Sequence, residues 1–441
     1  MITKKFFLGL SFSFIIANLS ILSQFCLAQE STEVFTIKQT IEQAIKVNLG
    51  LKSSEEDTKA AMAVKKSRFT NFLPTLSTRY QFERMDEGSS IGGFASTASD
   101  EYSWVTSFNQ PIFTGFSLLR QYDLAKLDVD AAKIGEDLQR QDIILNAKTT
   151  YFSLLKAQKL RNIAEETVTQ IDAQKEVADN FYQVGMSPLN DLLQAQVELA
   201  NAKQELIVEK NNMENAESNF NTLLRRPINT PVAIKDILDY TPFENDLDYC
   251  LAEAEKKRIE IKIADLEVEI ADKDLQLAKK DYYPSIDLEG SYFKFGTDWD
   301  VDGGEGIFDP SGWTIHATAT WNFWEWGRTS YGVKEKLSRV SQSQLRKDEI
   351  LDNIHLEVKK AYLRTIEAAE AIITVEKAIE QAKENFRINQ ERYKEQVATS
   401  TDVLDAQTLL SRTMTNYYNA LYAFKTAKAA LYRAMGVVIK E

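Results

Sequence analysis

A two-residue alternation of apolar and polar side chains predicts short strands in two parts of the chain. Leu76, Tyr80 and Phe82 alternate with polar neighbours, as in a strand that has one apolar face. The same period predicts four strands, at residues 76–83, 102–108, 286–289 and 315–323. They pair into two hairpins with polar, glycine-rich tips, at residues 87–100 and 298–311.

Each hairpin is followed by a segment with a helical pattern of unusual length. Residues 116–182 and 328–393 contain no proline and a single early glycine each, Gly135 or Gly332. At a rise of roughly 1.5 Å per residue, such helices are about 100 Å long. The returning helices repeat apolar residues at intervals of three and four, as in a coiled coil with many alanines. These positions are Leu192, Ala195, Leu199, Ala202 and Leu206, and later Val403, Ala406, Leu410, Tyr417, Ala420, Phe424, Ala427 and Leu431.

The chain also contains an internal duplication. Landmarks recur in the same order at separations of 210 to 212 residues, which is too long for a solenoid repeat. They are Ile41 with Leu251, Ala44 with Ala254, Pro74 with Pro284, Gly115 with Gly327, Tyr151 with Tyr362, Tyr182 with Tyr393, and Ala195 with Ala406. We therefore predict two repeats of one plan (helix, hairpin, very long helix, return helix), at residues 29–235 and 236–441.

This arrangement predicts a mainly α-helical protein with a small β part that several copies must complete. Four strands cannot close a barrel wide enough to continue into a bundle of long helices, and an open sheet edge in lipid leaves backbone groups unpaired. Three copies would supply a trimeric 12-stranded transmembrane β-barrel and a long coiled-coil helical barrel. Aromatic residues recur where strands meet helices, where a membrane-interface girdle is expected, although core packing would explain each one singly. They are Phe69, Phe72, Phe113, Phe116, Tyr282, Tyr283, Trp321, Trp324 and Trp326.

The N-terminus and the charge balance indicate an exported acidic protein. Lys4 and Lys5 precede an uncharged apolar run, and small residues at Cys26 and Ala28 suit cleavage before Gln29. Residues 1–28 are therefore predicted to be a signal peptide, with an uncleaved anchor as the alternative. Removal of the two lysines changes the net charge from −13 to −15, so we do not expect nucleic acid as a partner. Only Cys250 remains, and no internal disulfide can form.

Two kinds of segment, each present once in each repeat, resemble the outer-membrane efflux protein family, of which TolC is the type member. They are the strand-to-helix junctions 110–115 (QPIFTG) and 324–327 (WEWG), together with the helix-to-helix turns 184–191 (VGMSPLND) and 401–406 (TDVLDA). The resemblance covers nearly the whole mature chain. It implies a homotrimeric channel-tunnel in the cell outer membrane with its helical part in the periplasm. It also implies an exit duct for efflux or type I secretion, working with a periplasmic adaptor protein and an inner-membrane transporter, without cofactors or catalysis.

The same resemblance assigns roles to residues of the two helix-to-helix turns. Asp402 and Asp405 match the acidic pair of the pore constriction, where threefold symmetry would gather six carboxylates and favour cations. From the residues alone, both could equally be ordinary acids near a helix N-terminus. Tyr393 and Asp191 resemble the pair that latches the closed gate, whereas the family's latch arginine falls on Ala398, so closure is expected to be looser or to use Lys394. The exposed motif that meets the adaptor corresponds to Val184, Gly185, Met186 and Ser187, although a helix stop alone would explain Gly185.

Two motifs suggest chemistry but lie in hairpin tips. Residues 88–92 spell the nucleophile-elbow pattern GxSxG without the required strand and helix, which we interpret as coincidence. Asp298, Asp300, Asp302 and Asp309 have the spacing of a calcium loop, with a solvated acidic tip as the alternative; no metal site is predicted. The competing interpretation of the whole chain is a periplasmic coiled-coil adaptor or scaffold, which would not need two strand hairpins. An exported enzyme fits the pattern less well.

Overall fold

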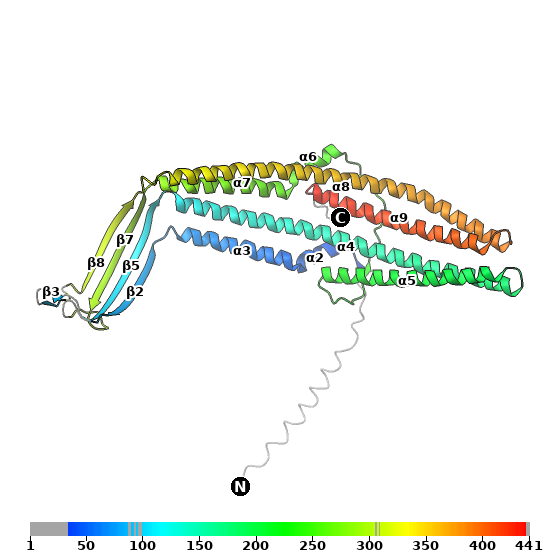
Figure 1. The fold of residues 1–441 in the computed structure, drawn as a ribbon, viewed down its shortest axis with the longest axis horizontal. Helices are drawn as coiled ribbons and strands as arrows, with labels where there is room; N and C mark the ends of the chain where they lie inside the picture. The colour runs from blue at the N-terminus through cyan, green and yellow to red at the C-terminus, as the bar shows by residue number, and fades with distance from the viewer. Residues whose placement is uncertain are drawn as a thin grey trace, which may run out of the picture.

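The protein is a long rod with a β-sheet at one end and a helical tip at the other (Figure 1). The computed structural model describes residues 34–437, except 87–89, 92–93, 96–98, 305–306 and 308. The predicted signal peptide and most of the GxSxG segment lie outside the described residues.

The four predicted strands form one antiparallel sheet. β2 (Thr75–Arg84), β5 (Asp100–Thr114), β7 (Ser285–Gly296) and β8 (Ser311–Thr320) lie in the order β2-β5-β7-β8. Each hairpin comes from one repeat, and the two hairpins join through β5 and β7. β5 and β7 are longer than the sequence pattern indicated, and β8 ends before residue 321, so the following tryptophans lie outside the strand. Within the described chain, β2 and β8 are left with one unpaired edge each.

The pairing register separates the sheet into two chemically different faces. One face carries large apolar side chains, many of them exposed, such as Leu76 at 77 % and Trp313 at 72 %. The other face carries mainly polar residues, and its hydroxyl pairs bond across strands, as between Ser77 and Ser107 at 2.9 Å and Ser291 and Thr314 at 2.8 Å. The alternation predicted from the sequence therefore runs through most of the sheet. It fails at the outer end of β7, where Phe293 and Phe295 fall on the polar face and Lys294 falls on the apolar face.

The helices follow the same plan in both repeats (Figure 1). The first repeat has α2 (Ile37–Val47), α3 (Leu49–Thr70), α4 (Ser117–Gln183) and α5 (Leu189–Leu223). The second repeat has α6 (Leu247–Lys257), α7 (Ile259–Ala278), α8 (Arg328–Lys394) and α9 (Ser400–Ala434), with a 3₁₀ turn η1 (Lys279–Tyr282) after α7. α4 and α8 both have 67 residues, close to the predicted spans and lengths.

A break interrupts the helix before each hairpin, and the sequence pattern did not predict it. Asn48 ends α2 and caps α3, because its side-chain oxygen accepts a hydrogen bond from the N–H of Leu51 at 3.0 Å. The corresponding Arg258 between α6 and α7 is buried and instead pairs with Glu260 and Glu357 at 2.8 and 2.7 Å. The break is thus stabilised by a cap in one repeat and by ion pairs in the other.

Each long helix begins at a sharp corner after the sheet. Gly115 and Phe116 have φ of 60° and 67°, and Trp326 and Gly327 have φ of 52° and 86°. An aromatic residue therefore occupies a left-handed conformation at each corner, which is uncommon for a side chain of this size. The corners redirect the chain from the sheet into α4 and α8.

The middle of the rod holds a compact core and a connecting segment. Parallel strands β1 (Val34–Phe35) and β6 (Ala233–Ile234) lie against it, while β3 (Ser90–Ile91) pairs with β4 (Phe94–Ala95) at the outer end of the sheet. The largest cluster of buried side chains includes Tyr151, Phe152, Leu154, Leu155, Phe220 and Leu224. Residues 235–246, which we call the strap, leave this core and cross to the second repeat.

Two features are absent from the part of the chain that the structure describes. No helix there combines the length and hydropathy needed to cross a bilayer. No three His, Cys, Asp or Glu side chains there are grouped closely enough to hold a metal ion, so the aspartates of the calcium-like loop do not form such a group. Asp302 in that loop lies 3.8 Å from the Lys294 ammonium.

Candidate functional site at the helical tip

Two helix-to-helix turns lie together at the end of the rod farthest from the sheet (Figure 1). In the first, α4 ends at Gln183 and Gly185 takes a left-handed φ of 74°. The N–H groups of Gly185 and Met186 donate to the carbonyls of Tyr182 and Phe181 at 3.0 and 2.7 Å, which closes the helix end. A Cβ on Gly185 would meet no atom within 4 Å, so the backbone conformation is the reason for glycine here.

The second turn repeats this geometry without glycine. Gln396 has a φ of 61°, and the Val397 N–H donates to the Arg392 carbonyl at 2.8 Å. Val397 is 66 % exposed, and in the repeat it corresponds to Met186. Sequence reasoning missed Val397, although the constant separation between the repeats would have identified it.

Asp402 belongs to the structure that begins α9. Its carboxylate accepts hydrogen bonds from the N–H and the hydroxyl of Thr399, both at 2.8 Å, while the Thr399 hydroxyl accepts one from the Asp402 N–H at 3.2 Å. This is a capping box. The hydrogen bonds from Thr399 hold the pKa of the Asp402 carboxyl below its usual range, and Arg392 contributes in the same direction. Asp402 is therefore a fixed, exposed negative charge.

Asp405 lies one turn further along α9 on the same face as Asp402. Both side chains are exposed, whereas Val403 and Leu404 between them are buried. Residues three apart on a helix are surface neighbours, so the two carboxylates form one acidic patch. The structure thus brings together the predicted acidic pair within one chain.

Tyr393 and Asp191 meet at the same corner of the tip. Tyr393 is 3 % exposed, and its ring centroid lies 5.4 Å from that of Phe181 on α4. Burial raises the pKa of the Tyr393 hydroxyl, and the nearby Asp191 carboxylate raises it further. The hydroxyls of Ser187 and Ser400 oppose part of this rise, but the Tyr393 oxygen has no hydrogen-bond partner among the described residues. Within one chain, the predicted latch pair is therefore adjacent but not hydrogen-bonded.

The predicted adaptor motif is an exposed loop with two apolar side chains. Val184 is 67 % exposed and Met186 is 52 % exposed, while Ser187 is half-buried. Ala398, which stands where the family has its latch arginine, is half-buried, and Lys394, the expected substitute, is exposed. Each turn therefore exposes apolar side chains, Val184 and Met186 in the first and Val397 in the second.

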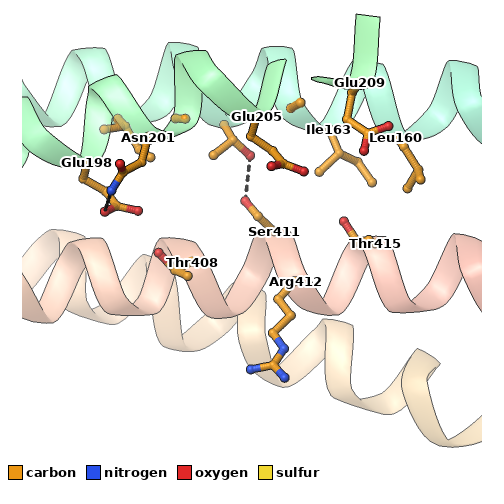
Figure 2. A pocket seen from close by; sticks show the side chains of 14 residues that line it. Leu160, Ile163, Glu198, Asn201, Glu205, Glu209, Thr408, Ser411, Arg412 and Thr415 are labelled. Atoms are coloured by element: carbon orange, nitrogen blue, oxygen red, sulfur yellow. Dashed lines mark hydrogen bonds between the residues drawn. The ribbon is translucent and has the colours of Figure 1, made fainter. Parts of the chain in front are cut away.

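α9 packs against both helices of the first repeat just behind the tip. The Thr401 hydroxyl donates to the Gln194 side chain of α5 at 2.8 Å, and Leu404 is buried among apolar residues of α4 and α5. Further from the tip, α5 and α9 separate and leave a groove of about 370 Å³ over α4. Figure 2 shows Glu198, Asn201 and Glu205 on one side of this groove and Ser411 on the other, hydrogen-bonded at 2.6 Å to Thr167 of α4.

Both repeats of the chain are similar to one known protein family. The family model described as outer membrane efflux protein matches residues 40–224 and 250–437, that is, both repeats. No curated protein sequence matches the chain.

Several solved structures of similar fold are described as outer membrane channels or proteins. The Campylobacter jejuni CmeC outer membrane channel has a TM-score of 0.79 and 18 % identity, over 91 % of this chain and 85 % of that one. The open state of the Neisseria gonorrhoeae MtrE outer membrane channel has a TM-score of 0.75 and 19 % identity, over 91 % and 89 %. The Vibrio cholerae outer membrane protein VceC has a TM-score of 0.76 and 16 % identity, over 91 % and 96 %.

The predicted fold class and family are confirmed. At these low identities, the likeness to solved structures shows the fold: mainly α-helical and duplicated, with long coiled-coil helices and a small sheet. The family match favours an outer-membrane efflux channel over the periplasmic adaptor that competed with it. Because the family model covers most of both repeats, the chain belongs to the outer membrane efflux protein family.

Proposed function

We propose that three copies of this chain form a passive exit duct for efflux or type I secretion. Twelve strands close a barrel in the outer membrane, and the helices cross the periplasm to an adaptor protein and an inner-membrane transporter that supplies the energy. The repeats are taken to cover residues 29–235 and 236–441 of the exported chain.

The observation that carries this proposal is the two-faced sheet with open edges. β2 and β8 each have an unpaired edge among the described strands, and the apolar face exposes Leu76, Tyr80, Trp313 and Ile315. In hydrocarbon, unpaired backbone groups are costly and an apolar outer face is favoured. Pairing of β8 with β2 of the next copy satisfies both conditions, with the polar face turned to the lumen.

The helices offer matching surfaces along the same two sides of the rod. On α8, Leu345, Leu356 and Leu363 are exposed at intervals that return to one helix face. On α5, Leu189 and Ile207 are exposed in a comparable row. In a closed ring, the first-repeat side of one copy faces the second-repeat side of its neighbour, which covers both rows.

The tip is proposed as the gate of the duct. Asp402 and Asp405, three of each in the trimer, line the constriction and favour cations. Tyr393 and Asp191 latch the closed arrangement, and the loop of Val184, Gly185, Met186 and Ser187 meets the adaptor. The fixed acidic patch, the adjacent latch residues and the exposed apolar loop support these roles.

The experiment is a reversal-potential measurement in planar bilayers. We expect the purified trimer to prefer K⁺ over Cl⁻, and the double variant Asp402→Asn with Asp405→Asn to lose much of that preference. Asp405→Asn alone separates the pore role from helix capping, because only Asp402 belongs to the capping box. Asp405→Glu, which keeps the charge, is the matched control and should behave as the unmodified protein. Unchanged selectivity in the double variant contradicts the placement of these acids at the constriction.

A further inference from the structure

Glu289 is held from both sides on the polar face of the sheet. Its Oε1 accepts a hydrogen bond from the Asn109 side-chain amide of β5 at 3.0 Å. Its Oε2 lies 3.0 Å from Nε2 of His316 on β8. The two partners come from the strands on either side of β7, so the carboxylate is fixed in the middle of the sheet.

The strand register places this group in one row across the sheet. Thr75 is opposite Asn109, Asn109 opposite Glu289, and Glu289 opposite His316. The residues before and after Glu289, Leu288 and Gly290, belong to the other, apolar face, because successive side chains alternate. Glu289 therefore shares its face with the hydroxyl pairs Ser77–Ser107 and Ser291–Thr314, while Phe293 and Phe295 lie on the same face nearer the outer end of β7.

This polar face has an excess of negative charge. By the same alternation, its carboxylates are Glu83, Glu101, Asp287 and Glu289, and its bases are Arg79 and His316. Glu289 is the carboxylate of this set that two hydrogen bonds restrain, while remaining 48 % exposed at its side chain. A restrained and accessible charge acts on a passing ion without side-chain reorganisation.

We propose that Glu289 is a second charge-selective position of the duct, one per subunit, which favours cationic solutes over anions at the sheet end. This inference rests on the proposed trimer with its polar face toward the lumen. Asn109 and His316 are positioning residues that keep the Glu289 carboxylate directed into the lumen of the proposed trimer. A unit charge felt across about 10 Å of water changes the local concentration of a monovalent ion by roughly two-fold.

The competing explanation is that the three residues only stabilise strand pairing, as cross-strand polar pairs commonly do. Both explanations predict some loss of stability when Glu289 is replaced. Only the selectivity role predicts that ion preference follows the charge at this position and weakens with salt.

The test uses Glu289→Gln in planar bilayers, in the otherwise native trimer and in the Asp402→Asn, Asp405→Asn background. We expect the K⁺/Cl⁻ permeability ratio to fall about four-fold in both backgrounds at 0.1 M salt, because the charge raises the concentration of K⁺ and lowers that of Cl⁻ by similar factors. The difference should disappear at 1 M, where the Debye length is about 3 Å. Glu289→Asp, which keeps the charge, is the matched control. A conducting Glu289→Gln trimer with an unchanged ratio at 0.1 M overturns the proposal. A native protein that neither trimerises nor conducts contradicts the proposed function instead.

A second variant tests the proposal even if Glu289→Gln does not fold correctly. Glu289→Cys is modified after assembly with a methanethiosulfonate carrying either a sulfonate or a trimethylammonium group. The native Cys250 is fully buried, so the unmodified protein treated in the same way is the background control. We expect the sulfonate to restore cation preference and the trimethylammonium group to lower it further. An equal effect of both reagents, or none, overturns the proposal.

Discussion

At the scale of single residues, one glycine allows the backbones of the two repeats to approach each other closely near the sheet. Gly115 has a left-handed φ, and a Cβ built on it would lie 2.4 Å from the backbone oxygen of Lys280. The corner of the first repeat therefore packs directly on η1 of the second. A side chain is excluded both by the backbone conformation and by the close approach.

Replacing Gly115 by alanine should consequently destabilise the protein. A left-handed conformation costs a non-glycine residue about 1–2 kcal/mol, and the contact with Lys280 adds to this. Gly135→Ala is the matched control, because its Cβ would meet nothing within 4 Å in the middle of α4. There alanine should be neutral or stabilising, by about 0.5–1 kcal/mol. Urea unfolding followed by circular dichroism compares the two, and equal stability would show that the Gly115 contact has no energetic effect.

Residue roles at the tip could be predicted only in part. The spacing of Asp402 and Asp405 left a helix-start role and a pore role open, and the structure adds a capping box without excluding the pore. Tyr182 and Tyr393 are related by the repeat, yet Tyr182 is 41 % exposed and Tyr393 is 3 % exposed. The sequence pattern predicts the same exposure for both tyrosines. Their exposure differs because it depends on how the two helix pairs pack on each other.

At the scale of elements, the strap connects helices that are far apart in the sequence. The Tyr151 hydroxyl donates to the Lys235 carbonyl at 2.7 Å, Lys159 of α4 forms an ion pair with Asp236, and Lys425 of α9 lies 2.9 Å from Asp239. Beyond these, Phe243 stacks edge-on near Tyr362 of α8 and Tyr432 of α9. The strap therefore binds α4, α8 and α9 together at the middle of the rod.

The ion pairs of the strap predict a pH dependence. Burial alone would raise the pKa of Asp236, but its hydrogen bonds to Lys159 and to the Leu238 N–H outweigh this and lower it. The hydrogen bond from Lys425 lowers the pKa of Asp239. A carboxyl with a lowered pKa in the folded state stabilises the fold above its unfolded pKa of about 4, and this contribution is lost as pH falls through the folded value.

The double variant Asp236→Asn with Asp239→Asn should therefore be less stable at pH 7, by about 0.5 kcal/mol for each half-exposed pair. It should also lose less stability than the native protein between pH 5 and pH 2, because the two titrating groups are gone. Glu244→Gln, an exposed acid of the same strap, is the control and should leave the pH profile unchanged. Thermal unfolding across this pH range gives the comparison. A double variant with the native acid sensitivity would assign that sensitivity to other carboxyls.

The sequence predicted regular elements well and irregular ones poorly. The long helices were expected at 116–182 and 328–393 and are observed at Ser117–Gln183 and Arg328–Lys394, since their periodicity runs for many turns without proline. The strap has no period, and its role depends on contacts with residues more than 80 positions away, such as Tyr151 with Lys235. The row of Asn109, Glu289 and His316 could not be predicted from the sequence either, because it depends on the register of three strands from two hairpins.

At the scale of the whole molecule, both long sides of the rod expose surfaces that are suited to contact with another copy. The open edges of β2 and β8 at one end continue into the exposed apolar rows of α5 and α8 toward the other. The need for further copies could be inferred from the number of strands alone. The sequence did not identify which helices meet the neighbour, because an exposed leucine and a core leucine have the same helical spacing.

Leu345 tests whether these sides meet in the assembled protein. It is 70 % exposed in the single chain, so Leu345→Glu should leave the fold of that chain and its helix content intact. In the proposed trimer the same carboxylate would be buried against a neighbour, at a cost of several kcal/mol, which should shift the protein toward monomers. Gln344→Glu adds the same charge one residue away and is the control. Light scattering of both variants after chromatography in detergent measures the mass. If Leu345→Glu remains as trimeric and as heat-resistant as Gln344→Glu, this face of α8 does not contact a second copy, and the order of subunits around the duct must be different.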